Sequence, residues 1–179
     1  MQNLKNQNKS IKILIFGDNN TGKSSLLIRY FQEKFNDNPY QQALDTYEKP
    51  RKIGNEEIFL KIWDFDSNQR QYQERQVLIR TFSLAIICYD INNKQTFLKS
   101  YDWYLDFMKG INQNMGVLAQ IGNKCDLQED YRQVSFQEVQ QFAQSFRMAF
   151  FEISAKTYYK VKELFDNIIT QTISENYDI

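Results

Sequence analysis

The chain has 179 residues with 22 basic and 22 acidic side chains, a charged fraction of 25% and an apolar fraction of 42%. These values are typical of one globular domain, and the zero formal charge gives no general argument for binding to nucleic acid or to an anionic membrane. The sequence contains no histidine. Catalysis by Ser-His-Asp or Cys-His groups and histidine-ligated metal sites are therefore excluded.

The ends of the chain and its cysteines predict a protein without a membrane anchor in a reducing compartment. The polar start MQNLKNQNKS predicts a flexible tail over residues 1–10, with neither a secretory signal nor a myristoylation site. The end ENYDI lacks a cysteine to prenylate, and no apolar run approaches the ~20 residues that span a bilayer. Cys88 and Cys125 have no disulfide or metal-site spacing, so we expect reduced thiols and a cytoplasmic location. One domain is predicted over residues 11–176, followed by the end segment 177–179.

The domain opens with a strand, a glycine-bounded loop and a helix. An apolar run over residues 11–16 predicts the strand, GDNNTGKSS over 17–25 fits G-x-x-x-x-G-K-[ST], and a helix is expected over 23–34. In this arrangement backbone N–H groups and the helix N-terminus converge on a phosphate. Lys23 would add a cation for the outer phosphates and Ser24 a hydroxyl ligand for Mg²⁺. The alternative is a plain glycine turn at a strand end.

The next stretch predicts a long connection and an edge hairpin. Residues 35–54 contain two prolines and no clear period, so we expect a long exposed loop that enters a weak strand. Residues 56–64 alternate between apolar and polar side chains, which predicts a strand paired antiparallel through a Gly54-Asn55 turn. Residues 65–80 are polar and predict a loosely held, poorly amphipathic helix.

The second half alternates strands with helices. Buried strands are predicted over 84–90, 116–121 and 148–153, and Thr96 is expected to cap a helix that extends to about 111. The apolar face of that helix is predicted to contain Phe97, Tyr101, Tyr104, Leu105 and Met108.

A capping box at residues 135–138 predicts the start of another helix, and an apolar pattern from residue 161 predicts the last one. The fold class that follows is α/β: a doubly wound, six-stranded, mostly parallel sheet with one antiparallel edge strand and helices on both faces. In such a sheet, ligands bind at the carboxyl ends of the strands.

A phosphate loop alone allows an ATPase, a nucleotide kinase, a sulfotransferase or a GTPase, and two later segments favour guanine. Asn123-Lys124-Cys125-Asp126 follows one predicted strand, and Ser154-Ala155-Lys156 follows the next, so both face the phosphate loop. The Asp126 carboxylate can accept two protons from the guanine edge, which adenine cannot supply. The Lys124 stem can cover one face of the base and Phe35 the other, while the Ala155 amide can donate to guanine O6.

The pieces GDNNTGKSSLL, IWD, AIICYDI, GNKCDL, VSFQEVQQFA and EISAKT stand in an order and spacing that resemble the small GTPases of the Ras superfamily, most of all the Rab branch. The resemblance covers residues 11–173 and implies the P-loop small-GTPase fold, bound GTP or GDP, and Mg²⁺ held by Ser24 with Asp64 behind it. The nucleotide contacts so implied are Asn20, Gly22, Lys23, Ser24, Ser25, Phe35, Asn123, Lys124, Asp126, Ser154, Ala155 and Lys156.

The two switch segments depart from the family pattern. The threonine of the first switch falls on Gln42 or Ala43, neither of which offers a hydroxyl, and Thr46 comes too late to replace it without a local shift. In the second switch, Asp64 is kept, but Ser67 replaces a glycine and Asn68 replaces the glutamine that positions water. We therefore expect very slow GTP hydrolysis, with no confident catalytic residue and an ineffective amide at Asn68.

Three functions remain open. The leading hypothesis is a Rab-like guanine-nucleotide-binding protein with weak or absent hydrolysis that acts through protein contacts made by its switch regions or in a larger complex. The second is an active Rab-type switch in intracellular membrane traffic, in which Thr46, Gln69 or a partner's residue compensates. The third is a nucleotide-bound structural subunit of a large assembly. An ATP-using kinase is the weakest alternative because it leaves Asp126 unexplained.

Overall fold

The central element is a sheet of six strands in the order β2-β3-β1-β4-β5-β6. A computed structural model describes residues 10–36, 46–53, 56–64, 79–110 and 118–176. The strands are β1 (Ser10–Phe16), β2 (Thr46–Ile53), β3 (Glu56–Asp64), β4 (Leu84–Asp90), β5 (Leu118–Asn123) and β6 (Ala149–Glu152). β2 pairs antiparallel with β3, and every other neighbouring pair is parallel. The predicted fold class is confirmed.

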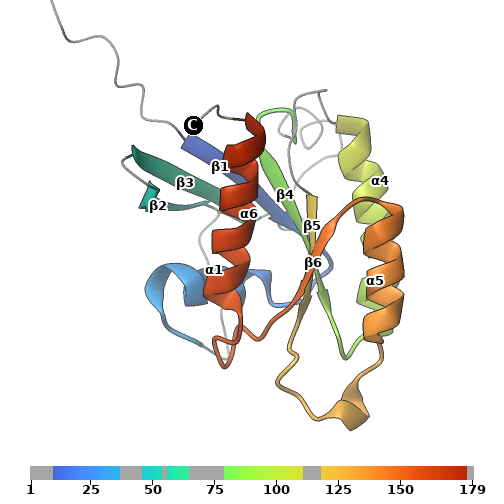
Figure 1. The fold of residues 1–179 in the computed structure, drawn as a ribbon. Helices are drawn as coiled ribbons and strands as arrows, with labels where there is room; N and C mark the ends of the chain where they lie inside the picture. Colours follow the sequence, from blue (N-terminus) through green and yellow to red (C-terminus); the bar gives the residue numbers. More distant parts are fainter. Residues whose placement is uncertain (1–9, 37–45, 54–55, 65–78, 111–117, 177–179) are drawn as a thin grey trace, which may run out of the picture.

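Helices cover both faces of this sheet (Figure 1). One face carries α1 (Lys23–Gln32) and α6 (Val161–Asn176), and the other carries α4 (Ser100–Gly110) and α5 (Phe136–Ser145). The short α3 (Lys94–Leu98) precedes α4, and a single 3-10 turn spans Glu129–Tyr131. None of the helices in the described residues is long and apolar enough to cross a membrane.

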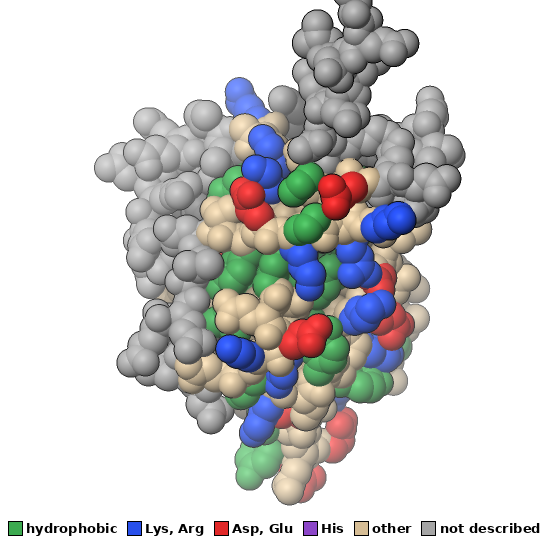
Figure 2. Space-filling model, turned by 90° about the vertical axis from the view of Figure 1, so that its left-hand side faces the viewer, with side chains coloured by type: hydrophobic (Ala, Val, Ile, Leu, Met, Phe, Trp, Pro, Cys, Tyr) green, Lys and Arg blue, Asp and Glu red, His purple; other side chains and the backbone are tan. Residues whose placement is uncertain are grey.

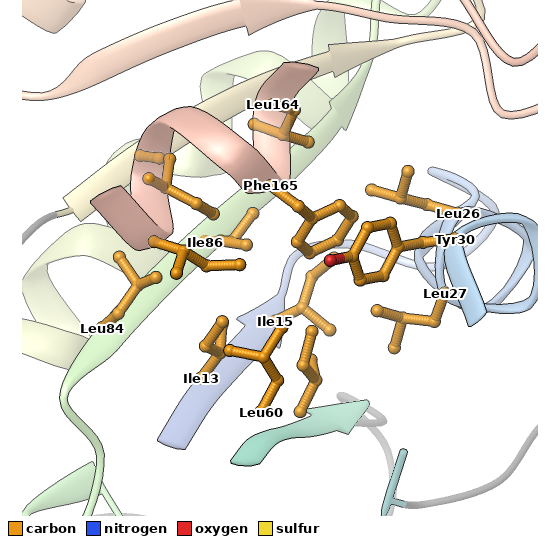
Figure 3. Packing of buried hydrophobic residues seen from close by; sticks show 14 of the residues in the cluster. Ile13, Ile15, Leu26, Leu27, Tyr30, Leu60, Leu84, Ile86, Leu164 and Phe165 are labelled. Atoms are coloured by element: carbon orange, nitrogen blue, oxygen red, sulfur yellow. The ribbon is translucent and has the colours of Figure 1, made fainter. Parts of the chain in front are cut away.

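β1 supplies apolar side chains to both layers. Ile11, Ile13 and Ile15 belong to the cluster under α1 and α6, whereas Leu14 and Phe16 belong to the cluster under α4 and α5. Successive side chains of a strand point to opposite faces, so a strand covered on both sides is apolar along most of its length. In the first cluster the Tyr30 ring stacks on Phe165 with centroids 3.9 Å apart (Figure 3).

Three predictions about α3, α4 and β5 are corrected by the structure. Asn93, not Thr96, caps the helix: the Asn93 side chain accepts from the Gln95 amide at 3.1 Å. Thr96 lies inside α3, where its hydroxyl donates to the Asn93 carbonyl at 2.8 Å and accepts from the Asp90 amide at 3.0 Å. The strand predicted over 116–121 ends two residues later than expected, because β5 continues to Asn123; residues 116–117 lie outside the described residues.

The predicted apolar face of α4 is only partly buried. Of the predicted residues, Phe97 lies in α3 and is buried; on α4, Tyr104 is half-buried, but Tyr101, Leu105 and Met108 are 43%, 37% and 46% exposed. The side chains that α4 buries are Ser100 and Phe107, which lie on a different side of the helix from Tyr101, Leu105 and Met108. Small residues such as Ser100 fit closely against the sheet, so the buried stripe lacks a strong apolar signal.

The other predicted elements are confirmed. β2 and β3 form the antiparallel edge, and Pro50 is accommodated because β2 has a neighbour on one side only within the sheet. Ser135 and Glu138 form the predicted capping box of α5, and the apolar stripe of α6 is buried. On the face turned to the viewer in Figure 2, basic and acidic side chains are interspersed. The predictions for 37–45, for the Gly54-Asn55 turn and for residues 65–78 lie outside the described residues.

Candidate functional site

Three loops leave the same edge of the sheet. They follow β1, β5 and β6, which run parallel, so the predicted phosphate loop and the two predicted base loops begin at one edge. The sequence-predicted residues of these loops lie together in the structure through the contacts described next.

The phosphate loop approaches neighbouring atoms so closely that two positions require glycine. A Cβ atom on Gly17 would lie 2.1 Å from the Cys88 carbonyl oxygen, and one on Gly22 would lie 2.2 Å from Asn123 Nδ2. Gly22 also has φ +89, a left-handed conformation that disfavours side chains. Asn20 has φ +61, as expected of the residue type that best tolerates this region after glycine.

Lys23 places a buried positive charge inside this loop. Its side chain is 7% exposed, and Nζ donates to the carbonyls of Gly17 at 3.0 Å and Asp18 at 2.9 Å. Within the described part of the chain these partners are neutral oxygens. A buried charge is costly without a counter-charge, so the loop is suited to an anion.

Ser24, the residue after Lys23, and Asp64 bring together two oxygen atoms that could be metal ligands. The Ser24 hydroxyl donates to Asp64 Oδ2, which joins the first turn of α1 to the end of β3. Hydroxyl and carboxylate oxygens are the donors that Mg²⁺ prefers, and Mg²⁺ at phosphate sites takes its other ligands from phosphate and water. The pair therefore fits the predicted metal position. In the described residues there is no group of three or more His, Cys, Asp and Glu that could hold a metal ion alone.

Asn123 joins the phosphate loop to both base loops. Its Nδ2 donates to the Thr21 carbonyl at 3.0 Å, and its Oδ1 accepts from the amides of Lys124 at 2.8 Å and Ala155 at 3.1 Å. Asn123 is 2% exposed. Both ends of the side chain are thus used within the protein, and a direct contact of Asn123 or of the Ala155 amide with nucleotide stays a prediction.

Ser154 fixes the carboxylate that is predicted to read the base. Its hydroxyl donates to Asp126 Oδ1 at 2.6 Å and accepts from the Thr157 amide at 3.0 Å. Ser154 is fully buried, whereas Asp126 is exposed. A carboxylate has about four lone-pair positions. Asp126 can therefore accept from Ser154 and still pair with a guanine edge.

Lys124 is held by an acidic residue that the sequence analysis did not single out. Lys124 Nζ lies 2.6 Å from Asp90 Oδ2, and the Asn92 amide donates to the other Asp90 oxygen at 2.9 Å. The Asn92 side chain donates to the Lys124 carbonyl at 3.0 Å. Asp90 is the last residue of β4 and lies at the carboxyl ends of the strands, where the three loops begin. A charged residue at that end of a predicted strand was the sequence feature that could have indicated its role.

Two further side chains, Lys99 and Arg29, contact the loops of the site, and no sequence pattern predicted these contacts. Lys99 Nζ lies 2.8 Å from Asp18 Oδ2 and ties the phosphate loop to the α3–α4 junction. Arg29, in the middle of α1, bonds to the loop that contains Ala155 and lies over the half-buried Phe35 ring. Ser25 is half-buried in the first turn of α1, and Lys156 is exposed. The predicted switch residues Gln42, Ala43, Ser67 and Asn68 lie outside the described residues.

The two cysteines are free, as predicted. Cys88 lies beneath the phosphate loop, where its thiol donates to the Thr21 carbonyl at 3.6 Å. Burial raises the pKa of the Cys88 thiol to about 11, an effect that nearby Lys23 opposes. Burial also raises the pKa of the Cys125 thiol. Both groups are therefore thiols rather than reactive thiolates at neutral pH.

Comparison with known proteins shows the family of the chain. A sequence model of the Ras family matches residues 12–174. The chain is 30% identical over 167 residues to Ras-related protein Rab-17 of Mus musculus, covering 93% of this chain and 78% of that protein. It is 31% identical over 165 residues to Ras-related protein Rab-21 of Bos taurus, covering 92% and 73% respectively. The chain thus belongs to the Ras family and is a Rab-like, GTP-binding small GTPase.

Proposed function

We propose that this protein holds Mg²⁺ and GTP or GDP, hydrolyses GTP very slowly, and acts through contacts with protein partners. The observation that carries the nucleotide site is the buried Lys23 ammonium, hydrogen-bonded to the neutral carbonyls of Gly17 and Asp18 within a glycine-bounded loop. Anion binding would supply the missing counter-charge. The joined Asp126 and Ser154 side chains favour a guanine base at the other end of the site.

Each group has a distinct part in binding. Lys23 and the amides of the phosphate loop hold the phosphates, and Ser24 with Asp64 would hold Mg²⁺, which shields phosphate charge when bound. Asp126 pairs with the guanine edge, Lys124 and Phe35 cover the base, and the Ser154-Ala155-Lys156 loop closes over it. Adenine would leave the Asp126 carboxylate without its two donors, which disfavours ATP.

The slow-hydrolysis part of the proposal comes from the sequence of the second switch. Phosphoryl transfer of this type depends on positioning and on charge stabilisation. Asn68 is one methylene shorter than glutamine, and Asp66 would add negative charge near the phosphate. Both changes lower the stabilisation of the transition state.

Single-turnover hydrolysis of preloaded GTP tests this part. We expect a rate well below the intrinsic rate of Ras, about 3–5 × 10⁻⁴ s⁻¹. The double variant Ser67→Gly/Asn68→Gln is expected to hydrolyse GTP at least about tenfold faster than the wild type, because it restores the glycine and the longer amide. Asn167→Gln, an amide change on the exposed side of α6, is the matched control. Brisk turnover by the wild type would refute slow hydrolysis.

An active switch is the second candidate, favoured by the position of Thr46. Thr46 starts β2 opposite Trp63, the residue before Asp64, so the Thr46 backbone lies one register position from Asp64. Its side chain shares the sheet face of Trp63, so this candidate requires a local shift that brings the hydroxyl to the metal site. This candidate predicts that a GTP analogue and GDP give different hydrogen exchange over residues 37–48 and 65–80. It also predicts that Gln69→Ala slows hydrolysis. Equal exchange with both nucleotides would favour the non-cycling protein.

The partner and location remain part of the proposal. A reducing, intracellular compartment is supported by the two free thiols. Recruitment to a membrane or to a large assembly would then depend on protein contacts. Co-purification of the full chain in a stable complex would favour the structural-subunit function over a free binding protein.

A further inference from the structure

Arg29 contacts the loop that is predicted to bind the base. Its Nε donates to the Ala155 carbonyl at 2.8 Å and its Nη2 donates to the Lys156 carbonyl at 2.6 Å. One guanidinium therefore binds two successive carbonyls of the loop that is predicted to meet the base. The planar fork of arginine suits such paired acceptors, which a lysine ammonium cannot bind in the same way.

The same guanidinium lies near two aromatic rings. Arg29 Cζ is 5.7 Å from the centroid of Phe35 and 5.8 Å from that of Tyr158. Phe35 is the predicted cover of one base face. Tyr158 has φ +68, a conformation that is costly for a bulky residue and persists only where surrounding contacts hold it. Arg29 thus contacts the base loop, the Tyr158 ring that follows it, and the predicted base cover.

These contacts connect the two halves of the site through one helix. The first turn of α1 carries Lys23 and Ser24 on the phosphate side, and a later turn of the same helix carries Arg29 on the base side.

We propose that Arg29 is a positioning residue that fixes the Ser154-Ala155-Lys156 loop and Phe35 around the base and thereby slows nucleotide release. The inference rests on the proposed function, since it concerns the same guanine site. Without Arg29 the two loop carbonyls lose a charged donor, and the loop can move away from the base while Lys23 and Ser24 still hold the phosphates.

The test is the dissociation rate of methylanthraniloyl-GDP from the full-length protein, measured with Mg²⁺ and again with excess EDTA. Arg29→Ala is expected to release the probe about tenfold faster, the effect of losing charged hydrogen bonds. The same acceleration is expected in EDTA, because EDTA loosens the phosphate side and Arg29 acts on the base side. Arg51→Ala is the matched control: it removes a half-buried arginine paired with Asp166 of α6, away from the loop.

Two further measurements separate positioning from general stability. Arg29→Lys keeps the charge and can donate to one carbonyl, so its release rate is expected between those of the wild type and Arg29→Ala. Hydrogen exchange is expected to rise over residues 153–160 in Arg29→Ala and to stay unchanged over α6. Arg29 Nη1 also donates to the Glu33 carbonyl at 3.0 Å. Increased exchange confined to α1 would show a helix-capping role and overturn the inference.

The outcomes distinguish this inference from the proposed function. A wild type that binds no guanine probe overturns both. A wild type that binds the probe while Arg29→Ala releases it at an unchanged rate overturns the role of Arg29 alone. If Arg29→Ala accelerates probe release with Mg²⁺ but not in EDTA, Arg29 acts on the phosphate side, which contradicts the proposal. A probe release rate in Arg29→Lys equal to that of the wild type also contradicts it.

Discussion

Asp90 lies at the end of β4 and holds Lys124 in place by a short ion pair. Replacing Asp90 with Asn removes the negative charge but keeps a side-chain oxygen for the Asn92 amide. Because the Lys124 side chain is 35% exposed, solvent screens part of the interaction. We expect a loss of about 1 kcal/mol in the free energy of unfolding and faster release of GDP.

Chemical denaturation and GDP release of Asp90→Asn check this expectation. Asp106→Asn is the matched control, since Asp106 pairs with Lys109 at 3.5 Å within α4, away from the three loops. The control is expected to change the unfolding free energy by less than about 0.5 kcal/mol and the release rate not at all. Equal effects of the two substitutions on GDP release would contradict a specific role for Asp90.

Gln120 is a polar residue whose burial lowers stability. It is fully buried on β5, and neither Nε2 nor Oε1 has a hydrogen-bond partner among the described residues. Its partners in register are Ile87 and Phe150, on the sheet face covered by α4 and α5. An unpaired buried amide costs about 1–3 kcal/mol.

Gln120→Met replaces the amide with an apolar side chain of similar shape. We expect it to raise the free energy of unfolding by at least about 1 kcal/mol in urea denaturation. Gln144→Met on the exposed side of α5 is the control and is expected to stay within about 0.5 kcal/mol of the wild type. A less stable Gln120→Met would mean that a bound water satisfies the amide.

At the residue scale, sequence reasoning singled out candidate side chains whose chemistry has a recognisable spacing. Lys23, Ser24 and Asp126 became candidates because each follows a strand in a short pattern with a chemical purpose, and their contacts with a nucleotide or metal stay predictions. Asp90 and Arg29 could not be predicted in the same way, since their contacts join segments far apart in the chain. Asn123 shows the same limit: its residue type was expected, but its use as the joint between loops was not.

At the scale of elements, the start of α5 depends on pH. The Lys94 side chain and then the Ser135 backbone and hydroxyl lower the pKa of Glu138 from 4.5 to about 2. Because the pKa is lower in the folded protein, this contribution to stability is present above about pH 4.5 and is lost as the pH falls toward 2.

Glu138→Gln tests this contribution. Glutamine can still accept a hydrogen bond at the helix N-terminus, but it cannot gain a proton in this range. We therefore expect a variant that is less stable at pH 7 and whose unfolding free energy falls less steeply between about pH 4.5 and 2. Glu57→Gln on the exposed part of β3 is the control. An unchanged slope in Glu138→Gln would contradict the assignment.

Elements with a continuous or strictly periodic apolar pattern could be predicted from sequence, as β1, β4 and α6 show. The face of α4 could not, because Tyr101, Leu105 and Met108 mimic a buried stripe while buried Ser100 carries no apolar signal. The cap of α3 was also ambiguous. Asn93 and Thr96 are both good capping residues, and the end of β4, which Thr96 contacts, decides between them.

At the scale of the whole molecule, the strand order explains why one ligand can stabilise the domain. β1 is an inner strand and β6 an outermost strand of the sheet, yet the loops that follow both contribute to the candidate site. A nucleotide that bridges them contacts both halves of the sheet. A ligand at one hundred times its Kd adds about 2.7 kcal/mol to the unfolding free energy.

Selection of guanine over adenine tests the account most directly. Competition binding of GTP and ATP to the full chain with Mg²⁺ measures it, with Asp126→Ala as the test variant and Asp102→Asn, on exposed α4, as the control. We predict that the wild type and the control bind GTP at least about a hundredfold more tightly than ATP, and that Asp126→Ala loses most of this preference. Equal affinity of the wild type for GTP and ATP would contradict the account.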